Sequence, residues 1–300
     1  MTMEYIVKAE ESGRRVRDIL RRSMGVSYTA MKSAKWNGRL RLNGEIVFTD
    51  AKVQAGDRVC IEWAEETPAY RPRRFDLPLT VPWEDEYLMA VVKPSPLASQ
   101  SSRNHPDDSL ENAVYTYFGC PEAFVYRPVN RLDRGTSGLM MIAKTPHAQH
   151  LMQRQLHTPC FRRRYLAWTD GVPDARKGII DLPIAKAPGA TVKREVNPDG
   201  KPSRTRYRVL EEKNGKALIL LELETGRTHQ IRVHLSAIGC PVRGDFLYGT
   251  EQPEEFPGRF ALHSAMLDAV HPVTGERILL TSLPAWAGQI PDPVLLMDFD

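Results

Sequence analysis

A proline-rich break near the N-terminus limits how this 300-residue chain can fold. Residues 65–78 read EETPAYRPRRFDLP and contain three prolines but no periodic apolar pattern, which is typical of a linker. The segment before the break is too short to enclose a large hydrophobic core, whereas the segment after it is long enough. The sequence therefore predicts a small module at 1–64, a linker at 65–78 and a large domain at 79–300.

The module has the pattern of two short helices followed by a small antiparallel sheet. Apolar residues recur at helical spacing in residues 13–24, and Ser27 can N-cap a second helix that ends at Asn37-Gly38. Residues 39–48, RLRLNGEIVF, alternate in polarity around an Asn-Gly pair, which indicates a hairpin. With a last strand at 58–63, RVCIEW, these elements predict a compact α/β module.

The positive charge of the chain is concentrated in this module. Residues 1–64 hold 12 Lys and Arg against 8 Asp and Glu, which accounts for the whole net charge of +4. Between residues 14 and 41, nine bases are accompanied by one acid, Asp18. Such a stripe favours binding to a polyanion, and a solvated helix face is the alternative.

Composition and the start of the chain argue against several classes of protein. No run of 18 or more apolar residues is present, and the first residues, MTMEYIVKAEESGRR, are charged where a secretion signal is apolar. The four cysteines are scattered and form no C-x-x-C pair, which argues against a zinc ribbon or a disulfide framework. We therefore expect a reduced, cytoplasmic protein without membrane association.

The large domain combines short apolar strands with scattered helices. Strands are expected at YLMAVV, KALILLELE and RILLTSL, and helices at 110–118, 146–156 and 228–237. Strand and helix do not alternate regularly in this order. We therefore expect an α+β fold with a mixed, largely antiparallel sheet.

The segment that is densest in candidate catalytic residues lies at 128–144, PVNRLDRGTSGLMMIAK. Asp133 stands between Arg131 and Arg134, and the apolar run LMMIA follows. If Asp133 enters a cleft beside that buried strand, it needs a cationic partner, because an unpaired buried carboxylate would take up a proton. A salt-bridged cluster at the surface is the other interpretation of the same residues.

Five segments of the large domain resemble, in order, the RluA family of pseudouridine synthases. RLDRGTSGL resembles the catalytic motif of that family, H-R-L-D-x-x-T-S-G-L. The others are WEDEYLMAVVKP at 83–94, RYLA at 164–167, TGRTHQIRVHLSAIGCPVRGDFLYG at 225–249 and RFALHSAMLDAVHP at 259–272. The resemblance implies isomerisation of uridine in RNA, in which the N1–C1′ bond is cleaved and the base is rejoined through C5.

The resemblance also implies roles for four residues of this chain. Asp133 would be the catalytic carboxylate, either as a covalent nucleophile or in a proton-abstraction route. Tyr165 would pack against the uracil or act as a general base, and Arg232 would pair with Asp133 and keep it ionised. Arg131 would fill the gap left in the RNA stack by the extruded uridine. The reaction requires neither a metal nor a redox cofactor.

Two segments depart from the family pattern. Asn130 replaces the histidine before Arg-Leu-Asp, and the opening strand reads VVKPSPL where the family has N-K-P-x-G. Asn forms hydrogen bonds but carries no charge, so we expect an effect on substrate placement or rate while Asp133 keeps its role. An RNA-binding protein of the same fold without catalytic activity is the alternative function.

Residues 4–64 resemble the S4 RNA-binding domain. They share a G-x-R start at Gly13 and Arg15, a serine that opens the second helix, the segment G-R-L-R-L-N-G and a G-D-x-V ending. Arg17 stands where that family often has an acid, which adds positive charge. By this resemblance, the RNA-binding candidates of the module are Arg14, Arg15, Lys32, Lys35 and Arg39.

Basic residues and histidines of the large domain complete the candidates. Arg162 and Arg163 shortly precede Tyr165 and are expected to contact phosphate, with a solvated strand end as the alternative. His229 and His234 are five residues apart and H-E-x-x-H is absent, so a metal hydrolase is a weaker hypothesis. The partner expected is RNA, either ribosomal RNA of the large subunit or transfer RNA, bound by a monomer.

Overall fold

The chain divides into two compact units, residues 1–70 and 71–300, in the computed structural model, which describes residues 2–63, 68–288 and 290–299. The division falls inside the predicted linker, whereas the predicted boundary between 64 and 65 lies outside the described residues. Among the described residues, no helix combines the length and the apolar character needed to cross a lipid bilayer.

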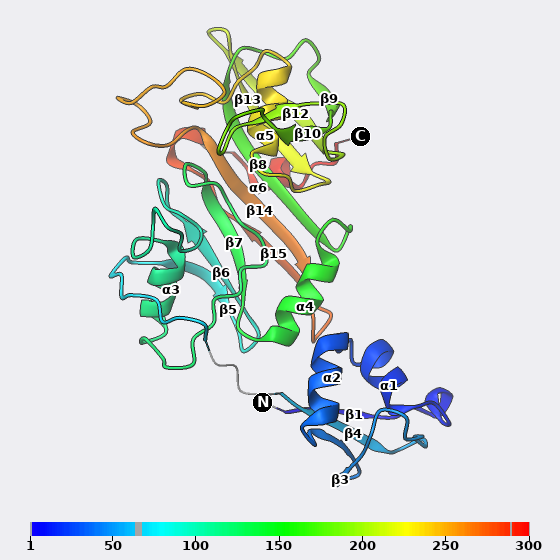
Figure 1. Ribbon diagram of the computed structural model, residues 1–300. Helices are drawn as coiled ribbons and strands as arrows, with labels where there is room; N and C mark the ends of the chain where they lie inside the picture. Colours follow the sequence, from blue (N-terminus) through cyan, green and yellow to red (C-terminus); the bar gives the residue numbers. More distant parts are fainter. Residues whose placement is uncertain (1, 64–67, 289, 300) are drawn as a thin grey trace. The chain divides into compact units, whose positions relative to one another are not determined.

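The N-terminal unit packs short helices against a small antiparallel sheet (Figure 1). Its elements are β1 (Thr2–Ile6), η1 (Ala9–Glu11), α1 (Val16–Asp18), η2 (Ile19–Ser23), α2 (Tyr28–Trp36), β2 (Leu40–Leu42), β3 (Glu45–Ile46) and β4 (Arg58–Glu62). In the described part of this unit, the strand order is β1-β4-β2-β3. The two predicted helical segments, the hairpin and the last strand are confirmed, and β1 is an edge strand that the sequence pattern missed.

Local sequence signals explain these elements. The Ser27 side chain accepts the backbone N–H of Ala30 and caps α2, as predicted. Asn43 and Gly44 both have positive φ, which gives the tight turn between β2 and β3. The apolar residues that are spaced along the first helical segment are fully buried: Val16, Ile19 and Leu20.

The large unit is built on a sheet of nine strands among the described residues. Its strands are β5 (Thr80–Glu84), β6 (Leu88–Lys93), β7 (Ser137–Ala143), β8 (Phe161–Asp170), β9 (Lys177–Asp181), β12 (Arg204–Lys213), β13 (Lys216–Leu223), β14 (Leu262–Val270) and β15 (Arg277–Thr281). The order is β5-β6-β7-β14-β8-β13-β12-β9, with β15 paired to β14. Only β7 and β14 run parallel in this part of the chain, so the predicted α+β class with a largely antiparallel sheet is confirmed.

The remaining elements of this unit lie around the sheet. They are a second small sheet of β10 (Ile184–Lys186) and β11 (Arg194–Val196), and the helices α3 (Leu110–Tyr117), α4 (Pro146–Gln155), α5 (Gln230–Ala237), η3 (Ala285–Ala287) and α6 (Asp292–Leu296). The three helices predicted in this domain correspond to α3, α4 and α5.

Both faces of the large sheet are buried at β7, which explains the apolar run in this strand. Met140 and Ile142 pack with residues of α3 and α5, whereas Leu139 and Met141 pack with residues of α4. Alternate residues of a strand point to opposite faces, so a strand that is covered on both sides reads as a continuous apolar run. The candidate site lies on the face that α5 covers.

Strands β7 and β14 approach each other closely at Gly138. Its φ is 108°, and a Cβ atom there would lie 2.3 Å from the carbonyl oxygen of Ser264. Only glycine tolerates both the backbone conformation and this distance. The glycine of the T-S-G segment therefore fixes the end of the loop that carries Asp133.

The second half of the predicted linker packs on the large unit. Phe75 and Leu77 contact its hydrophobic core, and the backbone N–H of Phe75 donates to the Thr116 hydroxyl over 2.8 Å. These residues are therefore anchored to the large unit, in line with a division of the chain just before residue 71.

Candidate active site

Asp133 lies on the wall of a cleft and is held there by Arg232. The loop before β7 carries Asp133, and the first turns of α5 bring Arg232 to it. The Nη1 atom of Arg232 donates to Oδ2 of Asp133 over 3.0 Å, and the two side chains are 3% and 26% exposed. The pairing that the family resemblance implied is present. Among the described residues, the other oxygen of Asp133 accepts no hydrogen bond, so it is open to a substrate.

A second carboxylate, Asp245, orients Arg232. Its two oxygens accept hydrogen bonds from Nε and Nη2 of Arg232 over 2.6 and 2.9 Å. The backbone N–H groups of Leu247 and Tyr248 also donate to Asp245. Burial lowers the pKa of Arg232, but its bonds to Asp245 and Asp133 outweigh burial and raise that pKa above the ordinary value. Arg232 is therefore a permanent cation with a fixed orientation.

Tyr165 lines the same cleft from the middle of β8. Its side chain is buried, and this burial raises the pKa of its phenol above the ordinary value of 10.0. The phenol therefore keeps its proton at neutral pH and is a poor proton acceptor. Of the two roles implied for Tyr165, packing against a base fits this environment better than general-base catalysis.

His229 presents a ring nitrogen to Asp133 from the N-terminus of α5. Its Nε2 atom lies 3.9 Å from Oδ2 of Asp133, and its Nδ1 atom lies 2.8 Å from the Tyr248 hydroxyl. That hydroxyl already accepts the backbone N–H of Arg194, so we assign its own proton to the bond with Nδ1. Burial lowers the pKa of His229, so the neutral ring carries its proton on Nε2, on the side of the cleft.

The cleft at Asp133 has a volume of about 560 Å³ and a basic rim. Arg131 is exposed and lines it, as do the side chains of Arg163 and Arg227. A smaller pocket of about 60 Å³ adjoins Asp133 and Tyr165 beneath α5. The volume of the larger cleft is typical of small-molecule sites and is sufficient for a nucleotide.

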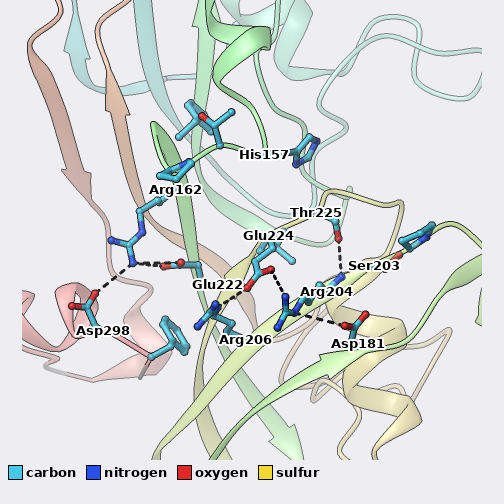
Figure 2. Close-up of a pocket in the computed structure, with 16 residues that line it drawn as sticks. His157, Arg162, Asp181, Ser203, Arg204, Arg206, Glu222, Glu224, Thr225 and Asp298 are labelled. Atoms are coloured by element: carbon cyan, nitrogen blue, oxygen red, sulfur yellow. Dashed lines mark hydrogen bonds and ion pairs between the residues drawn. The ribbon is translucent and has the colours of Figure 1, made fainter.

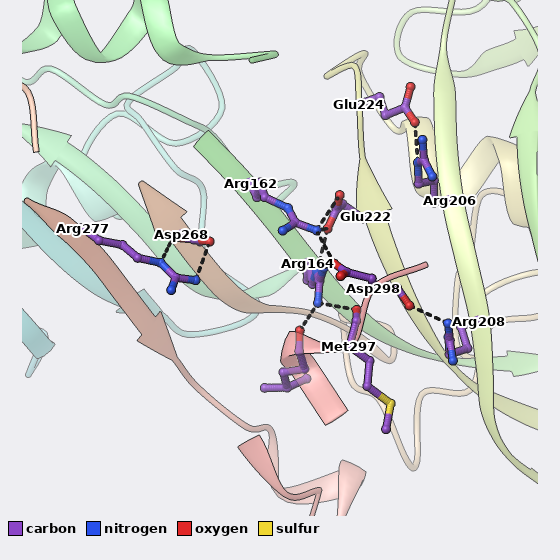
Figure 3. A network of polar contacts seen from close by, with 11 residues as sticks. Arg162, Arg164, Arg206, Arg208, Glu222, Glu224, Asp268, Arg277, Met297 and Asp298 are labelled. Carbon is purple, nitrogen blue, oxygen red and sulfur yellow. Dashed lines mark hydrogen bonds and ion pairs between the residues drawn. The ribbon is translucent and has the colours of Figure 1, made fainter. Parts of the chain in front are cut away.

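Strand alternation separates the arginines of β8 into two environments. Arg162 and Arg164 both bond to Glu222 on the side away from the cleft, where Arg164 also donates to carbonyl groups of the C-terminal segment (Figure 3). Arg163 lines the cleft with Tyr165, two residues further along the strand. Arg163 is 6% exposed, and its buried Nε and Nη2 atoms have no hydrogen-bond partner among the described residues.

A larger pocket of about 770 Å³ lies beside β8, β12 and β13, and Asp133 is not among its lining residues (Figure 2). Its arginines are paired with carboxylates: Arg206 bonds to Glu224, and Arg162 bonds to Glu222. Because these charges compensate one another, this pocket offers no excess positive charge to a phosphate. The smaller cleft at Asp133 is the better candidate site.

Asn130 anchors the Asp133 loop to β7. Its side-chain oxygen accepts the backbone N–H of Met141 over 2.9 Å, and its buried amide nitrogen has no hydrogen-bond partner in the described part of the chain. The residue that departs from the family histidine therefore supports the loop and lines the cleft without adding charge.

Lys93 supports the same loop from β6. Its Nζ atom donates to the carbonyl oxygens of Leu97 and Arg134 over 2.8 and 3.4 Å. Complete burial lowers its pKa to about 7, and the nearby Asp133 opposes this shift. Lys93 therefore ties together two segments beside the Asp133 loop.

The C-terminal histidines bond to other protein groups. The ring nitrogens of His234 contact the Thr205 hydroxyl and the Leu182 carbonyl, both over 2.9 Å. Among the described residues, no three His, Cys, Asp or Glu side chains are grouped so that they could hold a metal ion. The arrangement of the described side chains therefore gives the hypothesis of a metal hydrolase no support.

The structure brings five of the predicted residues to the cleft and the small pocket that adjoins it: Arg131, Asp133, Arg163, Tyr165 and Arg232. The predicted residues of the module belong to the other unit, and Arg162 faces the other side of β8. Sequence reasoning missed Asp245 and Tyr248, although both stand in the segment GDFLYG that carried the resemblance. The available signal was Asp245 itself, an acidic residue within the segment at 225–249 that resembles the family.

Comparisons with known proteins agree with this geometry. Residues 87–237 match the family model described as RNA pseudouridylate synthase. The uncharacterized RNA pseudouridine synthase YjbO of Bacillus subtilis is 35% identical, over 85% of this chain and 90% of its own length. The ribosomal large subunit pseudouridine synthase D of Salmonella typhimurium is 36% identical, over 90% of this chain and 86% of its own length.

A solved structure shows the same likeness. The human RNA pseudouridylate synthase domain containing 1 superposes with a TM-score of 0.57 at 26% identity, and covers 69% of this chain and 84% of its own. The family match, the relatives and the fold agree with one another. This chain belongs to the RNA pseudouridylate synthase family and is a pseudouridine synthase, an isomerase that acts on RNA.

Proposed function

We propose that this enzyme isomerises uridines of large-subunit ribosomal RNA, with Asp133 as its catalytic carboxylate. The observation that carries the proposal is the Asp133 carboxylate, which has one oxygen fixed by Arg232 and the other open to the cleft. The names of relatives that span most of this chain support the choice of ribosomal RNA over transfer RNA. We further propose that the enzyme acts in the cytoplasm as a monomer.

In this proposal each group at the cleft has one task. Asp133 acts at the sugar, by attack on C1′ or by removal of a sugar proton, and both routes begin from its ionised form. Arg232 holds the Asp133 carboxylate in position through its hydrogen bond, and Tyr165 packs against the uracil while the base turns between loss of its N1 bond and formation of its C5 bond. Exposed Arg131 takes the place of the extruded base in the RNA stack.

Arg163 is the phosphate contact of the cleft in the same proposal. A buried guanidinium with two unpaired nitrogens is costly, and a phosphate oxygen is a good acceptor for such a fork. Arg162 was predicted for the same task. However, it already bonds to Glu222, and its Nη2 atom lies 3.7 Å from Oδ1 of Asp298. Of these two candidates, Arg163 is therefore the one whose Nε and Nη2 atoms have no hydrogen-bond partner among the described residues.

We also propose that residues 1–64, within the N-terminal unit, form an S4-like RNA-binding module. Among the described residues, its five candidates make no ion pair: Arg14, Arg15, Lys32, Lys35 and Arg39. Arginine and lysine side chains that have no carboxylate partner and lie on one small unit favour association with the phosphate backbone of RNA.

The substrate is tested by mapping pseudouridine after incubation of the enzyme with unmodified large-subunit ribosomal RNA and, separately, with unmodified transfer RNA. Asp133→Asn serves as the matched control. We expect discrete modified positions in ribosomal RNA with the wild type and none with the variant. Modification of transfer RNA alone would overturn the choice of ribosomal RNA.

A further inference from the structure

One face of α2 in the N-terminal unit carries two exposed aromatic rings, an exposed lysine and a half-buried lysine. Tyr28, Lys32, Lys35 and Trp36 are spaced so that their side chains lie on the same side of the helix. Tyr28 is 63% and Trp36 is 69% exposed. The core of this unit uses the other side of the helix, where Ala34 is buried.

Phe48, which follows β3, extends this face and is 59% exposed. The Nζ atom of Lys35 lies 5.2 Å from the ring centroid of Trp36 and 6.0 Å from that of Phe48, so the cation contacts both rings. We call Tyr28, Lys32, Lys35, Trp36 and Phe48 the α2 aromatic face.

Packing within the unit does not explain this exposure. The hydrophobic core of the unit forms without the three rings of the α2 aromatic face, which remain in contact with water. Several large exposed aromatic side chains on one surface of a small unit indicate a binding site. Lys32 and Lys35 have no carboxylate partner among the described residues, so the charge of this surface selects an anionic partner.

The combination of rings and lysines fits unpaired nucleotides better than a duplex. The bases of a duplex are stacked on each other and offer no ring face along its length, whereas an unpaired base can stack on an aromatic side chain. Lysines between the rings can contact the phosphates of the same strand. We propose that the α2 aromatic face binds unpaired nucleotides of the RNA substrate by stacking, an inference that rests on the proposed RNA-binding function of this unit.

Two kinds of variant of the full-length protein separate stacking from charge. Trp36→Leu removes an aromatic face from an exposed position, and Trp36→Phe retains a ring as the matched control. Lys32→Glu combined with Lys35→Glu reverses the charge. Binding is measured over a range of salt concentrations to a short oligoadenylate and to the duplex of the same length that it forms with its complement.

Trp36→Leu is expected to weaken binding to the single strand by about tenfold, to leave the duplex unchanged and to keep the salt dependence of the wild type. Trp36→Phe should retain most of the affinity. The charge reversal should weaken binding to both probes and flatten the salt dependence, because it removes phosphate contacts. Unfolding curves of all variants should match the wild type, since these side chains lie outside the core.

The outcomes distinguish the inference from the function on which it rests. If Trp36→Leu binds the single strand as the wild type does, or loses affinity equally for both probes, stacking on this face is refuted. If the charge reversal also leaves both affinities and the salt dependence unchanged, the RNA-binding function of the unit fails as well. A partner other than RNA would then have to account for the exposed rings.

Discussion

Arg232 joins two carboxylates: it binds Asp245 through two nitrogens and reaches Asp133 with the third. Asp245 is completely buried, whereas Asp133 is partly exposed to the cleft. Asp245 is fixed by its burial and in turn fixes the planar guanidinium of Arg232. Arg232 therefore holds Asp133, the acid that faces the cleft, in a defined position. The catalytic proposal depends on this relationship.

Replacement of Arg232 should affect activity and stability together. Arg232→Met leaves Asp245 buried without its counter-charge, and we expect a loss of about 3–5 kcal/mol in the free energy of unfolding. Turnover should fall by at least about a hundredfold, because Asp133 loses the hydrogen bond that fixes its position in the cleft. Urea unfolding and a pseudouridine assay measure the two effects.

Arg232→Lys is the control for charge alone. Lysine keeps the positive charge but cannot bond to both carboxylates in one plane, so this variant should be more stable than Arg232→Met and still poorly active. Full activity in either variant would show that the position of Asp133 does not depend on Arg232.

The orientation of His229 should depend on the Tyr248 hydroxyl. Tyr248→Phe removes the hydroxyl that donates to Nδ1 of His229, so the ring becomes free to carry its own proton on Nδ1 and not on Nε2. Loss of one orienting hydrogen bond should lower kcat by roughly tenfold. Tyr117→Phe, which removes a hydroxyl bonded to Glu84 at the surface, should leave kcat unchanged. Equal rates for wild type and Tyr248→Phe would contradict the assigned tautomer.

His263 should make the protein sensitive to acid. Its ring nitrogens lie 2.8 and 3.3 Å from the hydroxyls of Ser137 and Ser282, and burial lowers its pKa from 6.5 to about 4. Between these values the unfolded chain binds the proton and the folded chain does not, so the free energy of unfolding falls as the pH drops through this window. This contribution should reach roughly 3 kcal/mol once both states are protonated.

His263→Gln tests this contribution, because glutamine forms hydrogen bonds but does not titrate. The free energy of unfolding in urea is measured for both proteins at about pH 7 and about pH 4.5. Because the two proteins have the same carboxylates, the contribution of these groups cancels when the changes with pH are compared. The wild type should lose more stability than the variant between the two conditions. If the wild type and the variant differ in free energy of unfolding by the same amount at both pH values, the prediction is refuted.

Local patterns made much of the fold predictable. The Ser27 cap, the Asn43-Gly44 turn and the apolar run of β7 each depend on neighbours in sequence, so their signals are readable without the fold. The edge strand β1 has no such signal, because it depends on pairing with β4, more than fifty residues further along the chain.

The candidate site was readable only in part. The resemblance pointed to Asp133 and Arg232, but the support of Arg232 by Asp245 arises from the turn after α5, which no periodicity describes. The pair Arg162 and Arg163 looked equivalent as a basic run. Strand alternation distinguishes them only when the environment on each side of β8 is known.

The most direct test of the central claim measures pseudouridine formation by Asp133→Asn at a uridine that the wild-type enzyme modifies. The substitution keeps the shape of the side chain and removes its charge, so RNA affinity should stay near the wild-type value. Pseudouridine formation should disappear, even at saturating enzyme and long incubation, because the open carboxylate oxygen is the proposed reacting group. Substantial turnover by the folded, RNA-binding variant would contradict the assignment of Asp133 as the catalytic residue.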